Sequence, residues 1–310
     1  MPPTPPAERP VGRRDLGLLG LGIVAVSFSS VLVRIAGDED APAFAIAFYR
    51  CAFAAAILAP LAVARHRDEL RALTRRRWGL ALLSGLVLSG HFATWIPSIS
   101  LTTVAASAVL VQTQPVWVAL FGRFVGERTS RLGVVGIGVA IVGTLVISGG
   151  GFEAGSRAAA GDLLAIAGAL FAAVYVLLGR NLRPTVSLVT YTSIVYTTSA
   201  VALACVMLAT RTPFTGFPPQ VWGLFVLITL GPQFGGHTVF NYLLGHLRAS
   251  IVSVSLLAEP VGAAILALVL LGEVPPASTL VGGAIVLAGV FVAIRAEAAR
   301  MPDVLAQPVD

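Results

Sequence analysis

The 310-residue sequence contains no lysine, and only 12% of its residues are charged. Hydrophobic residues make up 56% of the chain, and the mean hydropathy is +0.88. In an ordinary soluble domain about a quarter of the residues are charged. The composition therefore excludes a typical soluble globular domain and favours a polytopic membrane protein.

Cysteine is also scarce. Cys51 and Cys205 are the only two, and both lie inside apolar runs. Neither has a CxxC partner or a histidine-rich neighbourhood, so we expect no metal site, no redox site and no cofactor.

Several motifs that would indicate other functions are missing. The sequence has no G-x-x-x-x-G-K-[ST] phosphate-binding loop, which disfavours an ATP-driven pump. It has no HExxH motif, no aspartate-rich diphosphate motif and no aspartate clearly within an apolar core, which disfavours a membrane-embedded enzyme. The formal net charge of +6 does not indicate nucleic-acid binding, because the arginines fall between the apolar runs rather than on one face.

Apolar runs of about 20 residues, each long enough to cross a bilayer as a helix, recur along the whole chain. They predict an all-α membrane protein with ten transmembrane helices. The predicted spans are residues 15–36, 42–64, 77–97, 101–123, 131–149, 161–180, 186–208, 220–243, 249–271 and 277–297. The first run is too long for a signal peptide and is followed by further spans, so we interpret it as a transmembrane helix.

Arginine is distributed unevenly between the two sides of these spans. With the N-terminus inside, the outer side holds only Arg34, Arg157 and Arg211, and its first loop is acidic (Asp38-Glu39-Asp40). Basic residues in short loops stay on the cytoplasmic side. We therefore predict a multi-pass membrane protein with both termini in the cytoplasm.

The two halves of the chain resemble each other at one common offset. The matched pairs are His91 and His237, Arg34 and Arg180, Gly136 and Gly282, and Gly143 and Gly289. After a slip of one residue, Gln114-Pro115 aligns with Glu259-Pro260. Each half holds five predicted spans, and an odd number means that the second half enters the membrane from the opposite side. This pattern predicts two inverted five-helix repeats, an architecture typical of secondary transporters.

The predicted organisation has four parts. They are a disordered cytoplasmic N-terminus (1–14), a first repeat (15–150), a second repeat (151–298) and a cytoplasmic tail (299–310).

Both repeats carry a proline followed, about 12 residues later, by Gly-Glu. The segments are QPVWVALFGRFVGE (114–127) and EPVGAAILALVLLGE (259–273), and glycines follow on the next helix. Residues 102–147 and 248–294, which contain these segments, resemble the second half of an EamA domain. Over roughly residues 15–298 the chain resembles the EamA family of the drug/metabolite transporter superfamily. The resemblance implies an inner-membrane transporter, typically an exporter of amino acids, other small metabolites or drugs.

Polar residues inside the predicted spans are the candidates for substrate binding or coupling, because such residues are expensive in a bilayer. Glu259 lies about 15 Å into its helix, near mid-bilayer. Its carboxylate should therefore face the interior, find a partner or bind a proton. Two interpretations stay open, namely a coupling or substrate-amine site, or an ion pair with Arg50, which also lies near mid-depth.

The other candidates lie at related positions in both repeats. His237 and Asn241 share one helix face, as do His91 and Trp95. Gln112 and Gln114 are the counterparts of the Glu259 region, and Gln114 is the better cavity candidate of the two. Three prolines, Pro115, Pro260 and Pro232, are expected to interrupt their helices.

We interpret three sets of residues as structural. The tyrosines Tyr175, Tyr191, Tyr196 and Tyr242 are expected to pack, and the glycines at 136, 143, 282 and 289 to bring helices together. Glu127 and Glu273 are expected to serve helix starts and loop bonding.

The preferred function is a secondary active transporter that exports small neutral or zwitterionic metabolites, such as amino acids, by alternating access. Coupling to protons stays open. A facilitative channel-like uniporter or a drug efflux protein is the alternative, and a membrane-embedded enzyme comes last. The expected partners are a small-molecule substrate and the lipid bilayer, with protons and a second copy of the chain left open, and no nucleic acid.

The orientation gives a direct prediction. A reporter that is active only in the cytoplasm, fused after residue 310, should be active, and one that is active only outside the cytoplasm should be silent. The reverse result would contradict the ten-span model.

Overall fold

The structure is a computed structural model that describes residues 11–102, 107, 110–147, 156–271 and 277–299. All regular structure in these ranges is helical, as the sequence predicts. The first part of the chain contains α1 (Arg13–Asp38), α2 (Ala43–Arg65), α3 (Arg67–Ala72), α4 (Arg75–Leu101), α6 (Gln114–Gly122), η1 (Arg123–Val125) and α7 (Arg131–Ile147). The second part contains α8 (Ser156–Leu182), α9 (Leu188–Ala209), α10 (Pro219–Ile228), η2 (Thr229–Thr238), α11 (Val239–Leu243), α12 (Ala249–Ser255), η3 (Leu256–Ala258), α13 (Glu259–Leu271) and α14 (Ala277–Ala298).

Six of the described helices are long and apolar enough to cross a membrane. Several other predicted spans are divided into shorter pieces, so length alone does not establish the count of ten. Residues 1–10 of the predicted N-terminal segment, most of the C-terminal tail and Glu273 lie outside the described residues, and α1 begins at Arg13, inside the segment predicted to be disordered.

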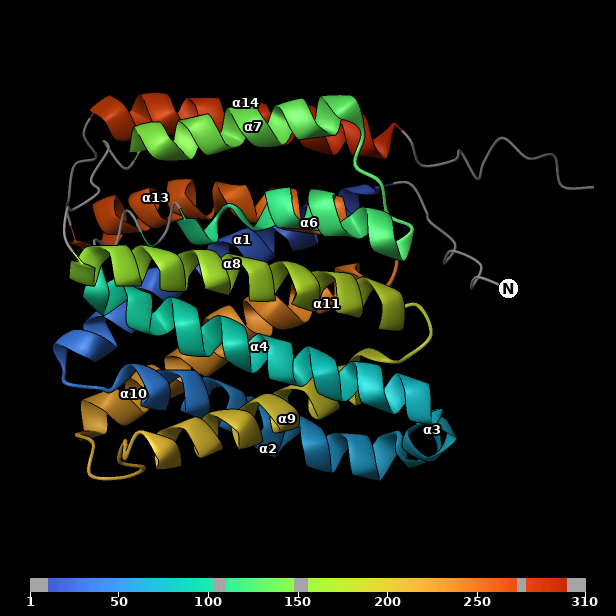
Figure 1. Cartoon of the computed structure of the whole chain (residues 1–310), viewed down its shortest axis with the longest axis vertical. Coiled ribbons are helices and arrows are strands. Elements are labelled where there is room, and N and C mark those ends of the chain that lie inside the picture. Colours follow the sequence, from blue (N-terminus) through green and yellow to red (C-terminus); the bar gives the residue numbers. More distant parts are fainter. Residues whose placement is uncertain (1–10, 103–106, 108–109, 148–155, 272–276, 300–310) are drawn as a thin grey trace, which may run out of the picture.

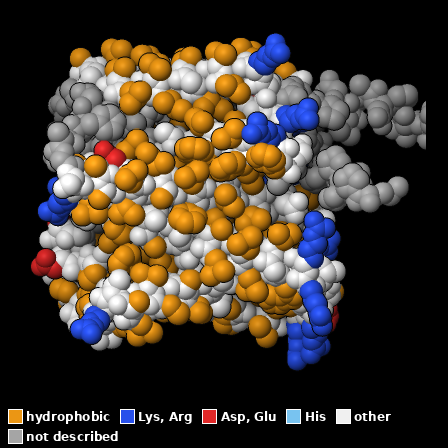
Figure 2. All heavy atoms as spheres, viewed as in Figure 1, with side chains coloured by type: hydrophobic (Ala, Val, Ile, Leu, Met, Phe, Trp, Pro, Cys, Tyr) orange, Lys and Arg blue, Asp and Glu red, His pale blue; other side chains and the backbone are white. Residues whose placement is uncertain are grey.

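The helices lie side by side in a stack (Figure 1). At one end α7 packs against α14, and at the other end α2 packs against α9. Helices α1, α4, α6, α8 and α13 lie between these two ends. Figure 2 shows hydrophobic side chains across the middle of one face and charged side chains near its edges, where the helices end. This pattern suits a molecule whose middle lies in hydrocarbon and whose helix ends reach water.

The divided helices change the predicted boundaries. α4 continues through Pro97 to Leu101, beyond the predicted end at residue 97. α6 starts at Gln114, after a turn at Gln112 and Thr113, and the described residues 107, 110 and 111 before this turn are helical. The predicted continuous span 101–123 is therefore interrupted at the turn. A proline cannot donate a backbone hydrogen bond to the preceding turn, which allows this break just before Pro115.

The other predicted spans around prolines are also irregular. In the span 220–243 the middle segment η2, which contains Pro232, is π-helical. In the span 249–271 the short 3₁₀ segment η3 ends immediately before Glu259 and Pro260. Both departures from α-helix place polar side chains at a point where the backbone is already distorted.

The repeated glycines allow the backbones of α7 and α14 to come into direct contact. A Cβ added at Gly143 would lie 2.6 Å from the Val286 nitrogen, and one at Gly289 would lie 2.5 Å from the Ala140 nitrogen. The neighbouring atoms belong to the backbone and cannot rotate away. These glycines therefore allow the first and second repeats to touch with almost no space between the two helices.

Substitution of Gly143 tests this contact. We expect Gly143→Ala to lower the melting temperature of the purified protein in detergent, because overpacking a tight interface costs about 1–3 kcal/mol. Gly138→Ala is the matched control on the same helix, since a Cβ at Gly138 meets nothing within 4 Å. The melting temperature of the control should stay level or rise, because alanine favours helix. Equal effects of the two substitutions would show that the glycine contact does not limit stability.

Candidate functional site

One cavity of about 70 Å³ lies between α1, α4, α6, α8, α11 and the η3–α13 junction. It has room for several water-sized molecules. Much of its wall is apolar and includes Val26, Val111, Val176 and Leu256. The cavity also brings together all but one of the predicted site residues, namely Glu259, His237, Asn241, Gln112, Gln114, His91 and Trp95. The exception is Arg50.

Glu259 is bound by side chains from the first half of the chain. Its Oε2 accepts a hydrogen bond from Gln112 Nε2 at 2.9 Å, and its Oε1 accepts one from Ser30 Oγ at 3.4 Å. Ser27 Oγ on α1 also donates to the Glu259 backbone carbonyl at 3.2 Å. The carboxylate is therefore held by neutral donors and not by a cation.

Of the two amides, Gln112 binds Glu259, whereas the repeat alignment makes Gln114 the counterpart of Glu259. The turn at Gln112 and Thr113 projects the Gln112 amide toward the carboxylate. Gln114, the first residue of α6, makes a long contact of 3.5 Å to the Ala172 carbonyl instead. Both amides are buried, so the break before Pro115 provides two polar groups to the same cavity.

The histidines form an aromatic wall on the other side of the cavity. Nδ1 of His91 lies 2.9 Å from the Gly168 carbonyl, which can only accept, so Nδ1 carries a proton. The His91 ring stacks on Trp95 at 5.7 Å between centroids, with an interplanar angle of 8°. Nε1 of Trp95 is buried without a partner among the described residues, so it can donate to a molecule in the cavity.

His237 is surrounded by three rings from two helices, α4 and α8. Its ring centroid lies 6.3 Å from His91, 6.4 Å from Tyr175 and 5.4 Å from Phe92. It projects from η2, whose wide turns carry Pro232 and two adjacent glycines. Wide π-helical turns occur often at functional sites, and here the turn aims His237 into the cavity.

Asn241 shares its side of the cavity with a tyrosine that we expected only to pack. Asn241 Nδ2 donates to the Tyr175 hydroxyl at 2.5 Å, and both residues line the cavity. The sequence gives little signal for such a role, because a tyrosine in an apolar helix most often packs. The repeat offered no counterpart that would have singled out Tyr175.

Arg50 binds Gln233 rather than Glu259. Its Nε donates to Gln233 Oε1 at 2.9 Å, and its guanidinium carbon lies 4.0 Å from the centre of the Phe92 ring. The ion pair between Arg50 and Glu259, one of the two interpretations of Glu259, is not formed. Gln233 was not among the predicted site residues, although a lone amide in an apolar run was a signal that could have found it.

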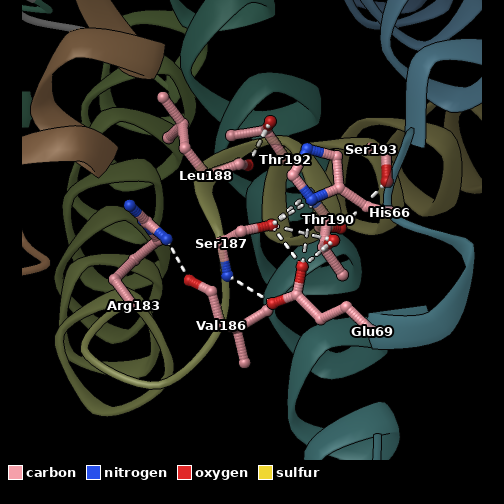
Figure 3. Close-up of polar contacts among 9 residues, drawn as sticks. All are labelled: His66, Glu69, Arg183, Val186, Ser187, Leu188, Thr190, Thr192 and Ser193. Atoms are coloured by element: carbon pink, nitrogen blue, oxygen red, sulfur yellow. Dashed lines mark hydrogen bonds and ion pairs between the residues drawn. The ribbon is translucent and has the colours of Figure 1, made fainter. Parts of the chain in front are cut away.

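A second polar cluster lies outside the cavity, at the start of α9 (Figure 3). Glu69 on α3 accepts hydrogen bonds from the Ser187 nitrogen at 2.6 Å, from Ser187 Oγ at 2.5 Å and from Thr190 Oγ1 at 2.6 Å. Nδ1 of His66 lies 3.3 Å from Ser187 Oγ and 3.4 Å from a Glu69 oxygen. In a nucleophilic triad the serine and the acid contact opposite nitrogens of the histidine, whereas here both contact Nδ1. We therefore interpret this cluster as a cap of α9.

Two other carboxylates near helix ends, Glu127 and Glu297, also bind segments that are distant in the sequence. Glu127 binds Arg180 at 2.7 Å and the Ala249 nitrogen, which starts α12, at 2.9 Å. Glu297 accepts from the Ser130 nitrogen, just before α7, at 2.7 Å. Glu127 thus binds the start of α12, a helix that is distant from it in the sequence.

Within the described residues no group of three or more His, Cys, Asp or Glu side chains could hold a metal ion. Cys51 is buried, Cys205 is exposed, and both are free thiols. The site is therefore a cavity of amides, histidines, one carboxylate and aromatic rings.

The model of the EamA-like transporter family matches residues 16–149 and 159–295. The chain belongs to this family. It is therefore a multi-pass membrane transporter with two EamA repeats, as the resemblance in the sequence implied. A transporter family implies a small-molecule substrate and a membrane environment.

The family relationship extends to proteins of other organisms. An uncharacterized transporter of Archaeoglobus fulgidus is 30% identical over 286 residues, which cover 88% of this chain and 95% of the relative. A probable terminal-alkyne amino-acid exporter of Streptantibioticus cattleyicolor is 31% identical over 195 residues, or 61% of this chain and 63% of that protein. A crystal structure at 21% identity superimposes with a TM-score of 0.75 over 90% of this chain and 96% of the other, so it shares the fold.

The α9 cap gives a prediction with a defined pH dependence. Partial burial alone would raise the pKa of Glu69, but the hydrogen bonds from Ser187 and Thr190 and the nearby His66 outweigh it and lower this pKa below its usual 4.5. A carboxylate whose pKa is lowered in the folded state stabilises the fold above its unfolded pKa. The stabilisation is lost as the pH falls through the folded pKa.

We therefore expect Glu69→Gln to lower the melting temperature at neutral pH, by the equivalent of about 1–2 kcal/mol for a lost helix cap. The difference from wild type should shrink as the pH falls below about 4. Asp68→Asn, on the exposed side of the same helix α3, is the control. A deficit that is as large in acid as at neutral pH would show that the Glu69 charge does not contribute.

Proposed function

We propose that this transporter exports small zwitterionic or neutral amphipathic solutes, such as amino acids and related metabolites, by alternating access. The observation that carries this proposal is the cavity inside the apolar stack, which is lined by polar side chains of both repeats. Transporters with inverted repeats bind substrate near the midplane, beside interrupted helices. The breaks before Pro115 and Pro260 adjoin this cavity.

The proposed architecture has ten spans in two five-helix halves of opposite orientation, with both termini in the cytoplasm. The divided segments α10–η2–α11 and α12–η3–α13 each serve as one span. The lining supports a solute of mixed character, because it combines a carboxylate, amides and histidines with apolar walls and Trp95. It offers few donors to a multiply charged phosphate. The amino-acid exporter among the relatives supports the same substrate class and the outward direction.

Glu259 is the proposed coupling group. It is the one carboxylate among the residues that line the cavity, and neutral donors bind both of its oxygens. Without a cation beside it, the carboxylate can exchange its negative charge for a bound proton or a substrate ammonium group. A channel-like uniporter would need no such group in its path.

Transport by purified protein in lipid vesicles tests this role. We expect an imposed pH gradient to drive movement of a transported amino acid in wild type, and Glu259→Gln to reduce this movement at least tenfold while the protein still inserts. The exposed Asp38 gives the matched control, Asp38→Asn, which should behave as wild type.

The substrate panel should include amino acids, amino-acid analogues, amines and a phosphorylated metabolite. Normal transport by Glu259→Gln along a pH gradient would contradict the coupling role. Transport that ignores every ion gradient in wild type would favour the uniporter.

A further inference from the structure

Arg50 is a fully buried cation with an incomplete set of hydrogen-bond partners. Its exposed fraction is 0%, and its Nε donates to Gln233 Oε1. Nη1 and Nη2 of Arg50 and Nε2 of Gln233 have no hydrogen-bond partner among the described residues. Three nitrogen atoms that can only donate therefore lie in one buried place.

A buried charge without a counter-charge is strongly unfavourable, because it has lost its water and gained no ion pair. The ring of Phe92, 4.0 Å from the guanidinium carbon, compensates only in part. The described ion pairs include none that involves Arg50. The unpaired N–H groups of Arg50 and Gln233 thus lack an acceptor, which a bound anion would supply.

The geometry of the donors selects a planar anion. A guanidinium presents parallel N–H groups that match the two oxygens of a carboxylate. Gln233 Nε2 adds a further donor next to the guanidinium, since the other end of the same amide binds Arg50 Nε. A carboxylate is therefore the chemical group that this place fits.

One side chain, that of Phe92, lies between the Arg50 guanidinium and the cavity residue His237. The Phe92 ring covers the guanidinium and meets the His237 ring edge-on at 5.4 Å between centroids, and His237 lines the cavity. Gln233 and His237 both project from the π-helical segment η2. Movement of Phe92 and His237 would open the donor groups of Arg50 and Gln233 to the cavity.

We propose that Arg50 and Gln233 form a carboxylate subsite and that the transported solute is a zwitterionic amino acid. The carboxylate of the solute binds Arg50 and Gln233 after Phe92 and His237 move, and its ammonium group faces Glu259 across the cavity. This inference rests on the proposed function and narrows its substrate class, since it requires both charges on one molecule. It also explains why Arg50 and Glu259 are not paired with each other.

Three solutes with the same side chain and amine test the subsite, namely leucine, leucinamide and 3-methylbutylamine. Wild-type protein in vesicles should transport leucine at least tenfold faster than the two solutes without a carboxylate. Arg50→Gln should reduce this preference to about twofold or less, mainly by slowing leucine. Arg34→Gln, which removes an exposed arginine on α1, should keep the wild-type preference.

Stability measurements separate a binding role from a structural one. Because the substitution removes an unpaired buried charge, Arg50→Gln should melt at the wild-type temperature or above it. Leucine should raise the melting temperature of wild type and not that of Arg50→Gln. A large drop in the melting temperature of Arg50→Gln without leucine, together with an unchanged solute preference, would overturn the subsite.

Other outcomes would contradict the subsite or the proposed function. In one further measurement, methanesulfonate in the buffer is replaced by chloride. If chloride then shifts the melting temperature of wild type but not of Arg50→Gln, and Arg50→Gln keeps the leucine preference, Arg50 and Gln233 bind an inorganic anion. The carboxylate subsite would then be wrong. If wild type carries the amine and the amide as fast as leucine, the subsite is wrong but the proposed function stands. If wild type carries no solute of the wider panel, the proposed function fails, and the subsite fails with it.

Discussion

The carboxylate of Glu259 depends on donors from the other half of the chain, and much of the central structure follows from this requirement. A polar group in an apolar interior must find its partners inside the protein. Ser30 and Gln112 meet Glu259 only because α1 crosses beside α13 and the chain turns before Pro115. The irregular turns at the two aligned prolines are thus part of one polar contact between the repeats.

The two charged side chains of the interior, Glu259 and Arg50, have different hydrogen-bond surroundings. Glu259 has a donor on each oxygen, whereas Arg50 has one bonded nitrogen, an aromatic ring and two nitrogens without partners. Their separation leaves an acidic side and a basic side within one apolar stack. A direct ion pair would have neutralised both charges and closed the interior to a charged solute.

Composition and repetition were enough to predict an all-α transporter and most of its cavity. The predicted residues were found because amides, histidines and a carboxylate are rare in these apolar runs. The partner of Glu259 was not predictable, since the turn that selects Gln112 over Gln114 depends on how the helix breaks. Tyr175 was missed because a buried tyrosine usually packs. Gln233 was missed although an amide is rare in an apolar run, and its contact with Arg50 depends on a π-helical turn that the sequence does not specify. The interpretation of Arg50 as the partner of Glu259 relied on depth alone, which does not specify the side of a helix.

The contact between α7 and α14 restricts how the two repeats can move. Gly136 and Gly143 of α7 and Gly289 of α14 each face the backbone of the other helix at positions where even a Cβ has no room. Sliding along the helix axes would bring alanine or valine side chains against these backbones, so translation is blocked in both directions. The contact between α7 and α14 therefore fixes the register of the last helix of the first half against the last helix of the second half.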